Sequence, residues 1–159
     1  MTDDQIIEQI VHSFIRFNLR DIQEIYNSEK EFTIAEFILC SCLIDQVSGF
    51  RYNTDKVGKR YRQFVKEYLP RYNSDELYND LRNKLVHNYS IGSRYKLISK
   101  AMHLHLQEID GNIYLNLSDF IADIRSALDQ YFSQLKNDKV IRQNAISWFH
   151  HHKIIGRSS

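Results

Sequence analysis

Pro70 is the only proline in this chain of 159 residues, and just five glycines accompany it. Because Pro and Gly are the residues that most often interrupt helices, most of the chain is free to form long helical segments. Apolar residues recur at three- and four-residue spacing over much of the sequence, which indicates amphipathic helices. A chain of this length is expected to form a single domain, here spanning residues 1–159.

The periodicity predicts six helical segments. Residues 2–4 are suited to cap the first segment, because hydroxyl oxygens and negative charges are favoured at a helix N-terminus. The second segment is apolar on nearly all sides between residues 32 and 44, so we expect it to be the most buried, and Ser48-Gly49 to end it. The helices are expected at residues 2–26, 30–47, 55–68, 74–88, 118–135 and 138–150.

The periodicity changes after Gly92. The stretch HLHLQEIDGNIYLNL alternates apolar and polar residues on both sides of Asp110-Gly111, which predicts a β-hairpin near residues 102–117. The predicted fold class is therefore all-α, a bundle of about five to six helices with one small inserted hairpin. Residues 138–159 are expected to form its C-terminal helix and tail.

Two cysteines, Cys40 and Cys42, lie in an apolar stretch. On a helix their spacing turns them about 160° apart, which suits neither a disulfide nor a shared metal ion, so we expect buried, inert thiols. No uninterrupted apolar run approaches the roughly 20 residues of a membrane span, and the acidic N-terminus is unlike a signal peptide. We therefore expect a soluble cytoplasmic protein.

Charge is unevenly distributed along the chain. Residues 1–50 hold 9 acids and 3 bases, a net charge of −6, whereas residues 51–100 hold 12 bases and 5 acids, a net charge of +7. Within residues 51–72 the bases alternate with aromatic rings, as on a surface that binds single-stranded nucleic acid. The cations expected to contact RNA are Arg51, Lys56, Lys59, Arg60, Arg62 and Lys84.

A structural explanation of the same segment stays open. Tyr61, Phe64 and Tyr68 have the spacing of a helix core stripe, and the cations are then an ordinary solvated face.

The stretch RNKLVHNY at residues 82–89 is the strongest candidate site. It places Arg82 and His87 near the end of a predicted helix. On a regular α-helix these two residues lie about 7.5 Å apart along the axis and about 140° apart around it, so one helix is not expected to bring them together. A second copy across a two-fold axis could pool both side chains in one cleft. The alternative is structural: an ion pair for Arg82, for instance with Asp75, Asp80 or another helix, and a dipole-favoured position for His87.

RNKLVHNY resembles the R-x-x-x-x-H motif of the HEPN superfamily, with a polar residue after the Arg. With Tyr89 it also resembles the R-x-x-x-x-H-x-Y form of HEPN toxins that pair with nucleotidyltransferase antitoxins. The resemblance implies a homodimeric endoribonuclease that needs no metal or cofactor and cleaves RNA by 2′-OH attack at a composite interface site. It also suggests a toxin or defence effector. The hairpin near residues 102–117 departs from the minimal HEPN bundle.

The same resemblance implies a role for each motif residue. His87 would exchange protons with the ribose or the leaving oxygen, Arg82 would hold the scissile phosphate, and Asn83 would orient the phosphate or His87. Tyr89 would be a possible acceptor for AMP groups added by an antitoxin. Two alternatives remain: a non-catalytic HEPN-like module that binds RNA or nucleotide, and a purely structural dimer.

The other histidines are weaker candidates. His150, His151 and His152 are adjacent and cannot all face one ion from a regular helix, while Trp148 and Phe149 are expected to pack that helix against the core. His103 and His105 lack the companions of a four-ligand site, so we expect surface residues. No metal site is predicted.

Overall fold

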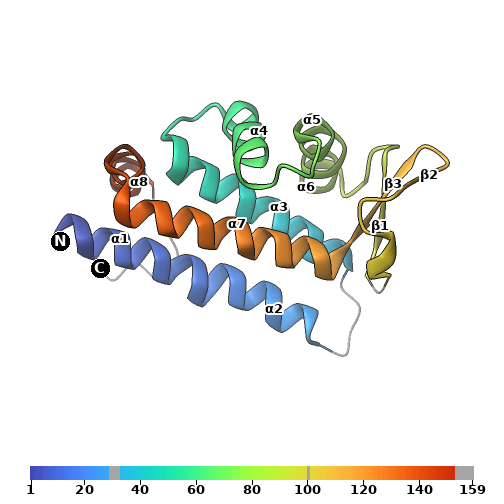
Figure 1. Ribbon diagram of the computed structural model, residues 1–159, viewed down its shortest axis with the longest axis horizontal. Helices are drawn as coiled ribbons and strands as arrows, with labels where there is room; N and C mark the ends of the chain where they lie inside the picture. Colours follow the sequence, from blue (N-terminus) through green and yellow to red (C-terminus); the bar gives the residue numbers. More distant parts are fainter. Residues whose placement is uncertain (29–32, 100, 153–159) are drawn as a thin grey trace.

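A computed structural model describes residues 1–28, 33–99 and 101–152 of the chain. It confirms a mostly helical fold with a small β insertion (Figure 1). Two of the helical elements, η1 and η2, are π-helical turns that join α-helices into longer rods. The elements of the bundle are α1 (Asp3–Ser13), η1 (Phe14–Leu19), α2 (Arg20–Tyr26), α3 (Thr33–Tyr52), α4 (Val57–Tyr68), α5 (Ser74–Glu76), η2 (Leu77–Asn83), α6 (Lys84–Asn88), α7 (Leu117–Asn137) and α8 (Lys139–His151).

The helices begin where side chains cap them. Thr2 forms a capping box with Gln5 at the start of α1. Asn73 accepts hydrogen bonds from the backbone N–H groups of the first turn of α5, and Asp138 does the same for α8. These starts agree with the sequence expectation, because the capping residues are polar and directly precede the periodic segments.

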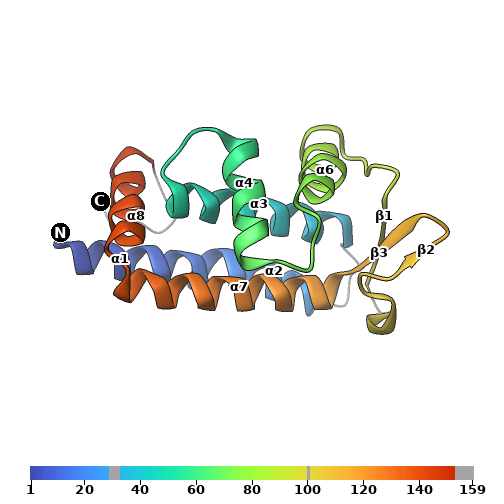
Figure 2. The ribbon, with the colours of Figure 1, turned by 45° about the horizontal axis from the view of Figure 1, so that its top comes forward.

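Helix α3 is the centre of the bundle. It contacts α2, α4, α6, α7 and α8 (Figure 2). Its side chains at Phe37, Leu43, Ile44, Val47 and Phe50 are buried. Among the described residues it is the one helix long and apolar enough to cross a membrane by length and composition, which a count of consecutive apolar residues did not show. Yet 56% of that stretch is buried inside the chain, as in the core helix of a folded domain.

The expected end of this helix at Ser48-Gly49 is wrong, because α3 continues to Tyr52. Gly49 has a packing role instead. A Cβ atom at Gly49 would lie 2.6 Å from the buried ring of Trp148 on α8, so the residue lets α8 approach α3 closely. Trp148 and Phe149 are both buried and hold α8 down, as predicted.

The β insertion is larger than the expected hairpin. Strands β2 (Glu108–Ile109) and β3 (Asn112–Asn116) do pair antiparallel around Asp110-Gly111, whose φ angles of 50° and 75° suit a tight hairpin turn. A third strand, β1 (Tyr95–Ile98), was not predicted and pairs parallel with β3. Residues Met102–Leu104 form a short 3-10 turn, η3, rather than a strand.

His105 lies between the insertion and the bundle. The prediction of a surface position is wrong, because the side chain is only 6% exposed. Its Nδ1 accepts the backbone N–H of Asn116 at 3.2 Å, and its Nε2 lies 3.1 Å from the hydroxyl oxygen of Tyr72. Tyr72 in turn donates to Asp123 on α7 at 2.6 Å. The ring therefore ties the insertion to the bundle, whereas His103 on η3 is exposed.

Candidate active site

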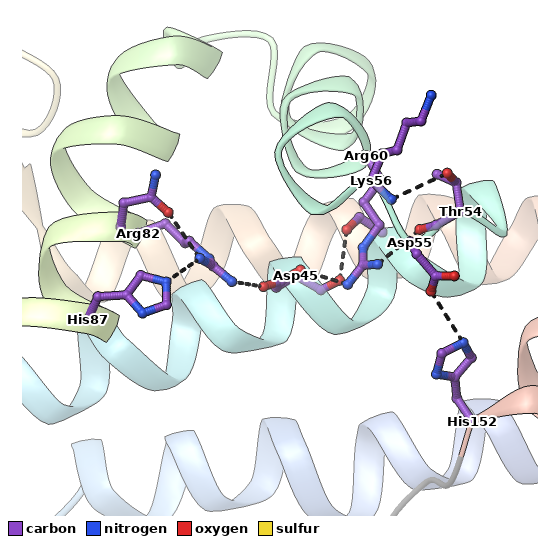
Figure 3. A network of polar contacts seen from close by, with 10 residues as sticks. Asp45, Thr54, Asp55, Lys56, Arg60, Arg82, His87 and His152 are labelled. Carbon is purple, nitrogen blue, oxygen red and sulfur yellow. Dashed lines mark hydrogen bonds and ion pairs between the residues drawn. The ribbon is translucent and has the colours of Figure 1, made fainter.

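Arg82 and His87 lie on one rod that runs through α5, η2 and α6. Arg82 is in the π-helical turn η2 and His87 is in α6. The expectation that a single helix would keep them apart is wrong: Arg82 Nη1 lies 3.0 Å from His87 Nε2 within one chain (Figure 3). The π-helical turn ends at Asn83 and the chain continues as an α-helix to His87, so it is the long Arg82 side chain that reaches the imidazole.

This contact defines the state of the imidazole. An arginine N–H can only donate, so Nε2 of His87 must be the acceptor and the neutral ring carries its proton on Nδ1. A doubly protonated ring could not accept this hydrogen bond. His87 is exposed, so its ring is open to a ligand while Arg82 fixes its orientation.

Arg82 is held by three side chains. Nη1 also donates to Asn83 Oδ1 at 3.0 Å, and Nη2 donates to Asp45 Oδ2 on α3. The structural explanation considered for Arg82 is thus present, with a partner on another helix. The side chain is 12% exposed, and its Nε is buried. Its contacts among the described residues use three of the five N–H hydrogens. Of the other two, the one on Nε is buried, and one on Nη2 is left for a ligand.

Asp45 is shared between two arginines. Its Oδ1 accepts from Arg60 Nη2 at 3.0 Å, and Arg60 Nη1 donates to the carbonyl oxygen of Thr54 at 2.9 Å. The guanidinium of Arg60 also lies 5.0 Å from the Trp148 ring centroid. A continuous polar network therefore runs from α4 across α3 to His87 (Figure 3).

Sequence reasoning missed Asp45 and the buried role of Arg60. A usable signal did exist. Asp45 directly follows the apolar run of residues 32–44, and an acid in such a helix has to be paired when it is buried.

Cys42 lies near this network. The expectation that both thiols are buried holds for Cys40 but is wrong for Cys42, which is exposed. Partial burial and the negative charge of Asp45 raise the pKa of Cys42, and the positive charge of Arg82 opposes them. Burial likewise raises the pKa of Cys40. Cys42 therefore marks the open side of α3 beside the Arg82–His87 pair.

Fewer side chains of residues 51–72 are exposed for contact with RNA than the sequence predicted. Its rings at positions 61, 64, 68 and 72 are buried in the core, which confirms the structural explanation for the aromatic stripe. Arg60 is buried against Asp45, Arg51 pairs with Glu67 at 2.7 Å, and Arg62 pairs with Asp75 at 2.6 Å. The exposed members of the predicted RNA-contacting set are Lys56, Lys59 and Lys84.

Tyr89 ends α6 in an unusual conformation. Its φ of 50° and ψ of 40° place it in the left-handed region, where glycine is the common choice at a helix end. The side chain is 67% exposed and lines an open groove of about 470 Å³ together with Ile34, Ile91 and Leu97. The tyrosine predicted as a modification site is thus accessible and lies two residues from His87.

The three C-terminal histidines diverge. His151 contacts the carbonyl oxygen of Ser147 at 2.7 Å, whereas His152 stacks on Trp148 and lies 3.7 Å from Asp55. His150 is exposed. Within the described ranges no group of three or more His, Cys, Asp or Glu side chains is arranged to hold a metal ion.

Comparison of the chain with known protein families, curated proteins and solved structures found no match. The function therefore has to be argued from the Arg82–His87 pair and its surroundings.

Proposed function

We propose that the protein is a metal-independent endoribonuclease of the HEPN type. The observation that carries this proposal is the contact of 3.0 Å between a fixed, largely buried Arg82 and an exposed His87. A held cation beside an accessible imidazole can stabilise a phosphate and move a proton at the same place. The motif RNKLVHNY supports the same assignment through its resemblance to that superfamily.

The chemistry can be written with the groups of this site. The ribose 2′-oxygen attacks the adjacent phosphorus, so that an O2′–P bond forms and the P–O5′ bond breaks. When RNA binds, the exposed His87 ring moves aside from Arg82, so that the fixed Nη1–H of Arg82 faces the phosphate and the freed Nε2 takes the 2′-hydroxyl proton. The leaving 5′-oxygen takes a proton from water or from His87 of a second copy. The products are a 2′,3′-cyclic phosphate and a 5′-hydroxyl.

In this scheme Arg82 offers the phosphate fewer N–H donors than an arginine without protein partners would. Asp45 and Asn83 keep two of its hydrogens, so the phosphate receives the N–H shared with His87 and the remaining hydrogen on Nη2. The exposed Lys56, Lys59 and Lys84 supply positive charge along the RNA backbone.

The homodimer and the antitoxin partner belong to the same proposal. Exposed apolar side chains at Ile34, Tyr89 and Ile91 lie close to the motif and suit burial against a second copy. An AMP group on the accessible Tyr89 hydroxyl would add negative charge beside the site and repel RNA. The proposed setting is the cytoplasm, where RNA is available as a substrate.

One observation favours a second function, a HEPN-like module that binds RNA or nucleotide without cutting it. The ion pair between Arg82 and Asp45 already occupies part of the guanidinium group, as in a structural contact. Such a module would bind RNA in a salt-dependent manner through its exposed lysines and release no products.

The deciding experiment is cleavage of end-labelled RNA with and without a metal chelator. Wild-type protein is expected to cut in both and to leave 2′,3′-cyclic phosphate ends. His87→Ala should lower the rate by about 100-fold or more while leaving thermal unfolding unchanged, because the side chain is exposed. His103→Ala, which removes an exposed histidine of the insertion, is the matched control and should cut normally.

Two results would contradict the proposal. One is undiminished cleavage by His87→Ala. The other is RNA binding by the wild-type protein without cleavage, with weaker binding after Lys56, Lys59 and Lys84 are changed to Gln, which would establish the binding module instead.

A further inference from the structure

The carboxylate of Asp45 is the point where three elements of the bundle meet. It lies on α3, and its two oxygens accept from Arg60 on α4 and from Arg82 on η2. All three side chains are largely buried, with 16% of Asp45, 11% of Arg60 and 12% of Arg82 exposed. Such charges are kept in a folded protein only when their partners are well placed.

The two arginines are not equivalent. Arg60 is anchored at its far side by the carbonyl oxygen of Thr54 and by the ring of Trp148, so it acts as a fixed support for Asp45. Arg82 is anchored by Asp45 through Nη2 and reaches His87 through Nη1. Because the guanidinium group is planar and rigid, fixing Nη2 also fixes the direction in which Nη1–H points.

We propose that Asp45, backed by Arg60, is a positioning residue that aims Arg82 at Nε2 of His87 and so fixes the tautomer of that ring. This inference rests on the proposed function, because it gives the Asp45 carboxylate a part in the reaction through Arg82. Asp45 itself touches neither His87 nor the reacting atoms. With the Nδ1–H tautomer in place, Nε2 keeps the lone pair that must take the 2′-hydroxyl proton.

A purely structural ion pair makes a different prediction. If the cluster only stabilises packing, then loss of the Asp45 charge lowers the free energy of unfolding but leaves the tautomer of His87 unchanged. The tautomer is therefore the readout that separates positioning from stability.

The first test measures the ring ¹⁵N chemical shifts of His87 by NMR at a pH where the ring is neutral. The His87 signals are assigned by their loss in His87→Ala. Wild-type protein should show a single Nδ1–H tautomer, and Asp45→Asn should show a mixture of both tautomers. Glu67→Gln is the matched control, because it also removes a carboxylate from an arginine pair, that of Arg51, and should leave the His87 signals unchanged.

A second variant guards against loss of the fold in Asp45→Asn. Arg60→Lys keeps the positive charge but loses the planar fork that holds both Asp45 and Thr54. Its His87 signals should move in the same direction by a smaller amount. An unchanged tautomer in either variant, with circular dichroism showing a folded protein, would overturn the proposal.

Kinetics on a dinucleotide substrate complete the test. Asp45→Asn should lower kcat by about tenfold or more with little change in KM and should alter the shape of the pH profile, because the orientation of the base is lost rather than substrate binding. If the wild-type protein cuts no RNA but its tautomer depends on Asp45, then the proposed function fails and the positioning role stands. If it cuts RNA and the tautomer ignores Asp45, then the positioning role fails alone.

Discussion

At the scale of single residues, Arg82 is positioned by side chains from several parts of the chain. Asn83 is its sequence neighbour, His87 lies in the next turn, and Asp45 comes from a different helix. The first two contacts lie inside the motif, yet ideal helix geometry places Arg82 and His87 on different sides, so the prediction for this pair was wrong. The third depends on how α3 packs against η2, which spacing along one helix does not describe.

Tyr89 provides a prediction at this scale. A non-glycine residue in the left-handed region costs about 1 kcal/mol or more, and the exposed side chain of Tyr89 offsets little of that cost. We expect Tyr89→Gly to be more stable than Tyr89→Ala by about 1 kcal/mol, since both lose the ring but only Ala keeps the strain. Urea denaturation of the two variants measures the difference. Equal stabilities would show that the backbone at this position carries no strain.

At the scale of elements, the sequence predicted the helix boundaries that depend on local signals. Asn73 and Asp138 cap their helices through bonds to the next few residues, so the signal is local. The predicted end of α3 at Gly49 was wrong because this glycine makes room for Trp148. That residue lies 99 positions further along the chain, so no local signal reveals the contact. Strand β1 was missed for a similar reason: its pairing with β3 is parallel and joins residues about 18 positions apart, such as Tyr95 and Ile113.

The contacts of Glu67, near the end of α4, with the last two residues of α3 lead to a prediction about how stability depends on pH. Glu67 accepts hydrogen bonds from Tyr52 at 2.6 Å and from Arg51 at 2.7 Å. Burial raises the pKa of Glu67, but these hydrogen bonds outweigh it and hold the pKa below its ordinary value. A carboxyl group of this kind stabilises the fold above its unfolded pKa, and its contribution is lost as the pH falls through the folded pKa.

We therefore expect acidification from about pH 7 to about pH 3 to lower the free energy of unfolding less in Glu67→Gln than in wild-type protein. Urea denaturation at both pH values measures this. Glu8→Gln, which changes an exposed carboxylate on α1, should behave like the wild type. If all three proteins lose equal stability on acidification, then the contacts of Glu67 contribute nothing to the pH dependence.

At the scale of the whole molecule, the uneven charge of the sequence becomes internal pairing. Asp45 from the acidic first third is bound by Arg60 and Arg82 of the basic middle third, and Asp4 is bound by Arg142 of the last helix at 2.7 Å. The charge pattern of the sequence predicts a surface for RNA. Composition does not reveal which of these charges pair with one another in the fold. Of the cations in that prediction, Lys56, Lys59 and Lys84 are exposed.

The proposed homodimer makes a prediction for Cys42. If the open side of α3 faces a second copy, then two Cys42 thiols lie near one another, whereas the buried Cys40 is out of reach. A short bis-maleimide should therefore link wild-type chains into a dimer on a denaturing gel. Cys40→Ser should be linked equally well, and Cys42→Ser not at all. Linking that disappears on dilution while cleavage persists would contradict a dimer built on this face.

The contacts that hold Arg82 have a consequence for transplanting the motif. Asp45 on α3 holds the guanidinium group that contacts His87, so eight grafted residues would not carry the whole arrangement with them. The smallest portable unit is the rod from Ser74 to Asn88 together with Asp45 on the helix behind it. A designed protein should keep that three-dimensional unit, and a search for distant relatives should look for it. The residues between Asp45, Arg82, Asn83 and His87 can vary.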